Sequence, residues 1–352
     1  MATSFQSHSF FITLAPPSAF AEENRDGEDP ANTAITIRCL PELTPLDMMD
    51  MASGVADPTG SCVWLGAFLF MEMFSRKLQE PASDVQRYWS HLRSTLFPPE
   101  CHAIELGAGT GMSGLSLMIS SLHERKCSVG GRKAASNKDT RTLACVGPSL
   151  MVLTDVNGDA LEFCRINCDA NIRNNRRECV HVRELEWGKG SAFKVFSPRE
   201  EPLPSSYDVV FATDVLYDLQ SLAPLVATSS ELLKDGGHFI LSHVPRASID
   251  PDCYPSVAGN SWQQLESIII DEASRVRLSL AKFIPFGRDD PYSDDVFAAI
   301  KQNNESDNMI LRPILLRHIW KDPCSLSNKF SWQNMIDVGA AVLVFCKEDV
   351  KS

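Results

Sequence analysis

The feature that most constrains the fold is the segment from Ala103 to Gly111, in which an apolar run ends at Glu105 and three glycines follow at alternate positions. Glycine has no Cβ and tolerates positive φ angles, so this spacing lets the backbone turn sharply and approach a bound molecule closely. The acid at the end of the run can accept hydrogen bonds from that molecule. Because a helix-like run begins directly afterwards, the segment predicts the first strand, loop and helix of an α/β domain that binds a nucleotide cofactor.

Strand-like and helix-like patterns alternate after this loop. Strands are predicted at 102–106, 150–154, 179–183, 207–212 and 237–243, helices at 112–122, 158–171, 220–234 and 261–275, and further strands at 278–284, 310–319 and 338–346. Two helices are predicted before the loop, at 62–77 and 84–96. Strands that alternate with helices need crossover connections, so the sequence predicts a doubly wound α/β domain with a mainly parallel sheet.

The glycines alone do not identify the cofactor. The stretch from Gly109 to Gly114 also fits the G-x-G-x-x-G pattern of dinucleotide-binding proteins, and glycine-rich turns occur in loops that bind nothing. Asp155 ends the second predicted strand, where an acid accepts hydrogen bonds from ribose hydroxyls. This position suits NAD and S-adenosylmethionine equally well, and Asp155 could instead cap the helix that follows.

Composition excludes several classes of protein. The 352 residues are 44% apolar and 22% charged, which is typical of a soluble globular protein, and no run approaches the ~20 apolar residues that cross a bilayer. A net charge of −12 argues against nucleic acid as a partner. The 11 cysteines form no C-x-x-C pairs and the histidines lack metal-ligand spacing, so we expect no metal and a reducing compartment: the cytoplasm, with the nucleus as the alternative. We also expect a monomer that does not bind a membrane.

Two segments depart from the alternating pattern. Residues 1–60 are acidic and are predicted to form an extended, partly disordered lead-in to the domain at 61–352, with only 33–40 resembling a strand. Residues 123–149 carry more basic than acidic side chains and separate the first predicted helix from the second strand. This insertion is predicted to be a surface loop.

Four motifs, in order along the chain, distinguish between the cofactors. They are Trp64-Leu-Gly-Ala, the glycine loop preceded by Glu105, Leu-Glu-Trp187-Gly, and Asp214-Val-Leu-Tyr217 after the fourth predicted strand. Together they resemble the seven-β-strand, S-adenosylmethionine-dependent protein methyltransferases of family 16, which contain many lysine methyltransferases. The resemblance covers about 60–243, including two asparagines, at 167 and 171, in the helix after the second strand.

The resemblance implies a seven-stranded sheet, S-adenosylmethionine as cofactor and a role for each matching residue. Trp64 would border the methionine part of the cofactor, Asp155 would hold the ribose, and Trp187 would lie near the adenine. The remaining cofactor contacts would come from the glycine loop and the end of the fourth strand, at Glu105, Gly107, Ala108, Gly109 and Thr213. For both tryptophans, plain core packing is the alternative.

Asp214 and Tyr217 follow the fourth strand, at the sheet edge where ligands bind in such folds. We expect both residues to orient the acceptor amine, with Asp214 attracting the incoming ammonium. The alternative is that Asp214 caps the next helix and Tyr217 packs beneath it. A lysine acceptor must also be neutral, which costs roughly 4–5 kcal/mol at pH 7 from a reference pKa near 10.4.

The sequence thus predicts methyl transfer to a side-chain nitrogen of a protein, with lysine as the preferred acceptor. Histidine or arginine in a protein, or a small molecule, could also be the acceptor, because the site residues do not separate one nitrogen from another. Two further hypotheses stay open, a catalytically silent scaffold with the same fold and an NAD-linked oxidoreductase. The sequence does not identify the substrate protein.

Overall fold

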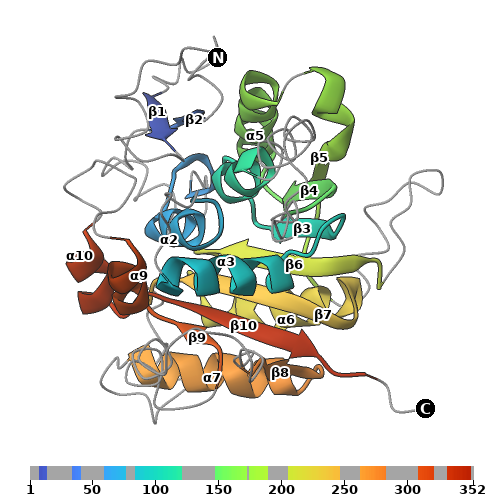
Figure 1. Ribbon diagram of the computed structural model, residues 1–352. Coiled ribbons are helices and arrows are strands. Elements are labelled where there is room, and N and C mark those ends of the chain that lie inside the picture. The colour runs from blue at the N-terminus through green and yellow to red at the C-terminus, as the bar shows by residue number, and fades with distance from the viewer. Residues whose placement is uncertain are drawn as a thin grey trace, which may run out of the picture.

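The computed structural model describes residues 8–13, 34–40, 59–76, 84–120, 147–172, 174–188, 205–245, 262–282, 308–320 and 331–349. These residues form a central sheet with helices on both faces and a small hairpin beside it (Figure 1). The strands of the sheet are β3 (His102–Leu106), β4 (Leu150–Asp155), β5 (Val180–Glu184), β6 (Tyr207–Thr213), β7 (Leu233–His243), β8 (Leu278–Leu280), β9 (Ile310–Leu311) and β10 (Ala341–Lys347).

The strand order in the sheet is β5-β4-β3-β6-β7-β10-β8, and β9 pairs with β10 as an eighth strand. The pairs among β3 to β7 are parallel, whereas β10 runs antiparallel to β7, β8 and β9. The chain leaves β3 toward β5 and then returns to β6 on the other side of β3. The predicted doubly wound, mainly parallel sheet is therefore confirmed, with its topological switch point between β3 and β6.

Alternate side chains on the strands supply two hydrophobic cores. On β4, Met151 and Leu153 belong to one core and Val152 to the other, as expected for a strand buried on both faces. The first core packs against α2 (Leu65–Phe74), α3 (Asp84–Leu96) and α5 (Gly158–Asn171). The second packs against α6 (Leu222–Leu232) and α7 (Trp262–Ser274), on the opposite side of the sheet (Figure 1).

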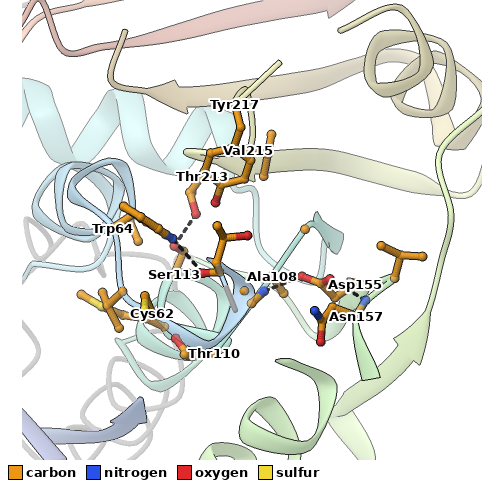
Figure 2. Close-up of a pocket in the computed structure, with 18 of the residues that line it drawn as sticks. Cys62, Trp64, Ala108, Thr110, Ser113, Asp155, Asn157, Thr213, Val215 and Tyr217 are labelled. Atoms are coloured by element: carbon orange, nitrogen blue, oxygen red, sulfur yellow. Dashed lines mark hydrogen bonds between the residues drawn. The ribbon is translucent and has the colours of Figure 1, made fainter. Parts of the chain in front are cut away.

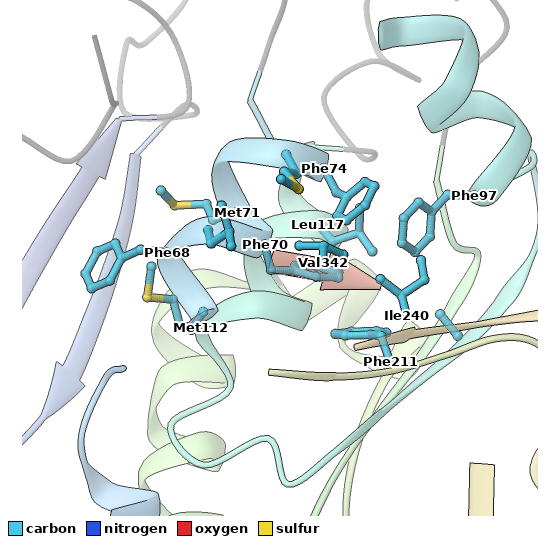
Figure 3. Close-up of a cluster of buried hydrophobic side chains, with 14 of the residues drawn as sticks. Phe68, Phe70, Met71, Phe74, Phe97, Met112, Leu117, Phe211, Ile240 and Val342 are labelled. Carbon is cyan, nitrogen blue, oxygen red and sulfur yellow. The ribbon is translucent and has the colours of Figure 1, made fainter. Parts of the chain in front are cut away.

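Helix α2 is buried on almost every side because it lies between the sheet and the helices around it. Phe70 stacks on Phe211 of β6, with ring centroids 4.7 Å apart, and Phe74 meets Phe97 at 5.3 Å (Figure 3). Such pairs add specific geometry to the burial of large apolar area. The helix therefore has a fixed position above the sheet, which matters because Trp64 directly precedes it.

The predicted strand at 33–40 is β2 (Ala34–Cys39), and it pairs with β1 (His8–Thr13), a strand that the sequence pattern did not predict. Two asparagines of α5 bind the other edge of β2. The side chain of Asn171 exchanges hydrogen bonds with the backbone N–H and C=O of Thr36, at 2.9 and 2.8 Å. Asn167 does the same with Arg38, at 2.8 and 3.0 Å, and also donates to the carbonyl of Thr110 in the glycine loop. The hairpin is thus connected to that loop through one buried amide.

Several predicted element boundaries were wrong. The predicted strand at 310–319 is the short β9 followed by helix α9 (Pro313–Ile319), because Pro313 has no N–H for a strand and suits the first turn of a helix. The predicted strand at 338–346 begins only at Ala341, after α10 (Trp332–Asp337) and a left-handed Gly339. Residues 220–234 form a 3-10 turn, η7 (Leu219–Ser221), and α6, after which β7 begins at once.

Some predictions fall on residues that are not described. Most of the basic insertion at 123–149 and most of the N-terminal segment at 1–60 lie outside the described ranges. Within those ranges, no helix has the length and apolar character needed to span a membrane. The described residues also contain no group of three or more His, Cys, Asp or Glu side chains that could hold a metal ion.

Replacement of Asn167 by Asp should destabilise the fold by about 2–3 kcal/mol, because both donated hydrogen bonds are lost at a buried site. Chemical denaturation measures the free energy of unfolding. The matched control is Glu162→Gln on the exposed side of the same helix, which should change stability by less than about 0.5 kcal/mol. Equal effects of the two substitutions would contradict the proposed connection between α5 and β2.

Candidate functional site

A pocket with a volume of about 250 Å³ opens at the carboxyl ends of the parallel strands, where the strand order reverses (Figure 2). This is the general ligand position in doubly wound folds. The structure brings most of the predicted site residues together in its wall: Trp64, Gly107, Ala108, Gly109, Asp155, Trp187, Thr213 and Tyr217. The other two, Glu105 and Asp214, are buried nearby and do not line it.

Each glycine of the loop has a left-handed backbone, with φ angles of 68° at Gly107, 54° at Gly109 and 80° at Gly111. A Cβ on Gly107 would lie 3.1 Å from the ring of Trp187, and one on Gly109 would lie 2.8 Å from the carbonyl oxygen of Gly60. Gly60 belongs to η3 (Thr59–Ser61), which lines the same pocket. The glycines are therefore required by the protein's own packing as well as by the turn.

Asp155 lines the pocket with its carboxylate held in place by two backbone groups. One oxygen accepts a hydrogen bond from the N–H of Gly109 and the other from the N–H of Asn157, both at 2.9 Å. Each carboxylate oxygen can accept more than one hydrogen bond, so these two contacts do not by themselves exclude a ligand hydroxyl. The helix that follows is capped by another residue, because the side chain of Asn157 accepts from the N–H groups of Asp159 and Ala160.

Glu105 has surroundings that differ from the predicted ones. Its neighbours on β3, Ile104 and Leu106, face the second core, so strand alternation directs Glu105 toward the opposite face and residues 112–120. Its carboxyl group accepts a hydrogen bond from the N–H of Gly114 at 3.0 Å, at the start of that helix, and one from the hydroxyl of Thr213 at 3.4 Å. Glu105 thus links the start of that helix to the end of β6.

Burial raises the pKa of Glu105 to about 8, and the negative charge of Asp155 acts in the same direction. Hydrogen bonds from the Gly114 backbone and from two hydroxyls lower the pKa but do not cancel this effect. The carboxyl group is therefore mostly protonated at neutral pH. A neutral acid avoids the large cost of a buried, unpaired charge.

Two aromatic side chains meet at one end of the pocket. The indole N–H of Trp64 donates to the carbonyl of Thr59 at 2.9 Å, which fixes the orientation of the ring. Its ring contacts that of Tyr217 edge to face, with centroids 5.9 Å apart. Figure 2 places this pair on the opposite side of the pocket from Asp155. Tyr217 is 42% exposed, so the pair lies at the rim.

Asp214 also differs from its predicted position. It is buried, and its two carboxylate oxygens accept hydrogen bonds from the N–H groups of Gly66, at 2.9 Å, and Val244, at 3.0 Å. Its φ angle of 59° lies in the left-handed region, which Asp tolerates better than most residues. The carboxylate thus ties the first turn of α2 to the ends of β6 and β7.

Sequence reasoning missed several residues of the pocket. Val156, which follows Asp155, is 61% exposed and presents an apolar surface there, and its position after the strand-ending acid was a usable signal. Asp218 and Ser221 follow Tyr217 and line the pocket as well. No local signal marked 59–62, because only the packing of η3 on the glycine loop brings these residues to the site.

A sequence model of lysine methyltransferases matches residues 46–254, which is more than half of the chain, so the chain belongs to that family. Among individual relatives, the protein N-lysine methyltransferase METTL21A of Mus musculus is 30% identical over 134 residues, equal to 38% of this chain and 48% of the relative. The chain thus spans about half the length of the curated relative it matches.

Solved methyltransferase structures are also similar. A methyltransferase from Pyrococcus furiosus is 14% identical with a TM-score of 0.35, covering 76% of this chain and 84% of that one. A geranyl diphosphate methyltransferase in complex with SAM is 10% identical with a TM-score of 0.35, covering 74% and 84%.

Replacement of Glu105 by Gln should change how stability depends on pH. The folded-state pKa of about 8 lies above the ordinary value of 4.5, so the folded protein binds the extra proton between these values. The wild type should therefore lose stability relative to the Gln variant as the pH rises from 4.5 to 8, and the difference should then stay level. Denaturant unfolding at a series of pH values measures this difference, and parallel profiles for the two proteins would refute the assignment.

Proposed function

We propose that the chain transfers a methyl group from S-adenosylmethionine to a side-chain nitrogen of a protein, with lysine as the acceptor. The observation that carries this proposal is the pocket at the switch point, which combines a positioned carboxylate, Asp155, with the aromatic surfaces of Trp64 and Trp187. Membership of the lysine methyltransferase family supports it, as does the likeness to mouse METTL21A, whose name specifies protein lysine.

The residues present fit the parts of the cofactor. Asp155 would accept hydrogen bonds from the ribose hydroxyls, because its carboxylate lines the pocket, is oriented by the backbone, and each carboxylate oxygen can accept more than one hydrogen bond. Val156 and Trp187 would cover the adenine, which accounts for a valine with most of its surface exposed. Trp64 would border the methionine part. When bound, S-adenosylmethionine supplies a methyl group activated by a sulfonium.

The acceptor would enter past the rim formed by Trp64 and Tyr217. Placement of two reactants in line can remove about 7–11 kcal/mol of the barrier. Apolar walls also disfavour a charged amine, and this lowers the pKa of an entering lysine and reduces the cost of its deprotonation. Because the rim is exposed, water can take the proton before the amine is enclosed, and no dedicated base is required. Tyr217 would orient the neutral amine through its hydroxyl.

Ligand-dependent unfolding tests the cofactor assignment. A ligand at 100 times its dissociation constant stabilises the folded protein by about 2.7 kcal/mol, which corresponds to a shift of several degrees in Tm. We expect S-adenosylhomocysteine to raise the Tm of the wild type, NAD to leave it unchanged, and Asp155→Ala to abolish the shift. Protection by NAD alone would favour an oxidoreductase. Protection by neither ligand would favour a scaffold.

Methyl transfer itself tests the acceptor. With labelled S-adenosylmethionine and a protein extract, the wild type should label lysine side chains, identified by mass spectrometry of the products. Tyr217→Phe should reduce the rate about tenfold or more, because it removes a hydrogen bond that orients the amine while keeping the ring against Trp64. Full activity of this variant would exclude the proposed role of the Tyr217 hydroxyl, and labelled histidine or arginine would correct the acceptor.

A further inference from the structure

We infer that Asp218 is the carboxylate that receives the ammonium of the acceptor, whereas Asp214 is a positioning residue that acts through α2. This inference rests on the proposed function, because it concerns how a cationic amine reaches the pocket. It divides between two acids the role that the sequence pattern assigned to Asp214 alone.

Asp214 is unsuited to receive an ammonium. It is buried outside the pocket wall, where its two oxygens accept hydrogen bonds from Gly66 and Val244. An ammonium that bound to it would have to leave water for the protein interior, which is costly for a charged group. The same contacts define what Asp214 does. Gly66 lies two residues after Trp64, and its carbonyl accepts from the hydroxyl of Ser242, so Asp214 and Ser242 together hold the start of α2.

Asp218, unlike Asp214, is exposed and lines the pocket. It follows Tyr217 directly in the chain. One carboxylate oxygen accepts from the N–H of Gln220 at 2.9 Å, which caps η7 and orients the group. The backbone there is held by Ser221, whose hydroxyl donates to the Asp218 carbonyl at 2.6 Å. Within the described residues, the second carboxylate oxygen has no hydrogen-bond partner.

Asp155 is the other carboxylate in the pocket wall, and it lies in a different part of that wall. Both of its oxygens are engaged by the backbone, and it lies on the opposite side of the pocket from Tyr217 (Figure 2). Asp218 is therefore the acid of the pocket wall that stands next to the aromatic rim.

The location of Asp218 at the rim also suits the chemistry. A carboxylate beside the reacting nitrogen would favour the ammonium form and so oppose the loss of the proton. A carboxylate at the exposed rim attracts the cation before it loses that proton, in water, where the ion pair is weak and easily broken. Such a charge acts on encounter and on KM, and salt screens it. The arrangement therefore favours lysine over a neutral acceptor.

Asp218→Asn and Asp214→Asn form a matched pair, since Asn preserves the shape and tolerates a left-handed backbone. Each variant is assayed for methyl transfer to a protein extract at low and high salt, for S-adenosylhomocysteine binding and for Tm. At low salt, Asp218→Asn should raise the half-saturating extract concentration about 2–5-fold, and at high salt this difference should largely disappear. The maximal rate, the affinity for S-adenosylhomocysteine and the Tm should change little. Asp218→Glu should restore the wild-type value, and Asp271→Asn, at an exposed position of α7, controls for net charge.

Asp214→Asn should instead lower the Tm and weaken S-adenosylhomocysteine binding, because Trp64 loses its support. The loss of ligand affinity distinguishes positioning from general destabilisation.

Butylammonium binding to the protein saturated with S-adenosylhomocysteine provides a test that does not need turnover. Asp218→Asn should weaken butylammonium binding and leave binding of neutral pentanol unchanged. Equal butylammonium affinity of wild type and Asp218→Asn would overturn the inference, as would an Asp214→Asn variant that weakens butylammonium alone. Absence of methyl transfer by the wild type would contradict only the proposed function.

Discussion

The left-handed backbone of the glycine loop is the constraint on which the rest of the site depends. Each of the three glycines allows a different segment of the chain to pack closely against the loop. Gly107 lies against Trp187 and Val215, Gly109 lies against η3, and Gly111 lies over Cys164 of α5. Because any side chain at these positions would both strain the turn and push a neighbouring segment away, the loop determines where three distant parts of the chain can meet.

Polar contacts add direction to the positions that core packing gives these elements. Aromatic packing holds α2 above the sheet, and hydrogen bonds with buried side chains link α2 and the hairpin to particular residues of the site. The side chains of Asn167 and Asn171 bind β2 as a neighbouring strand would, and Asp214 binds the first turn of α2. These groups are buried and would be costly to leave unpaired, which makes each a strict positional constraint. As a result, Trp64 and η3 reach the pocket in one arrangement.

Local pattern predicted much of the fold, and its failures have identifiable causes. The bounds of α3 and α5, the strand that ends at Asp155 and the mainly parallel character of the sheet follow from periodicity and punctuation within short windows. Strand β1 was missed because the acidic composition of residues 1–60 favoured a disordered lead-in, and the surroundings of Asp214 were missed because Gly66 lies 148 residues away. Sequence identified which acids end strands. It could not identify what each acid faces, because that depends on helices packed from elsewhere in the chain.

The four acids around the pocket illustrate how packing assigns different states to the same functional group. Glu105 is fully buried, and burial keeps it mostly neutral at pH 7. Asp155 and Asp214 are both held by backbone N–H groups, but Asp155 lies in the pocket wall and Asp214 is buried outside it. Only Asp218, among the four, combines exposure with an uncommitted oxygen. Of the four, only Asp155 and Asp218 present a carboxylate in the pocket wall, whereas the side chains of Glu105 and Asp214 are buried outside it.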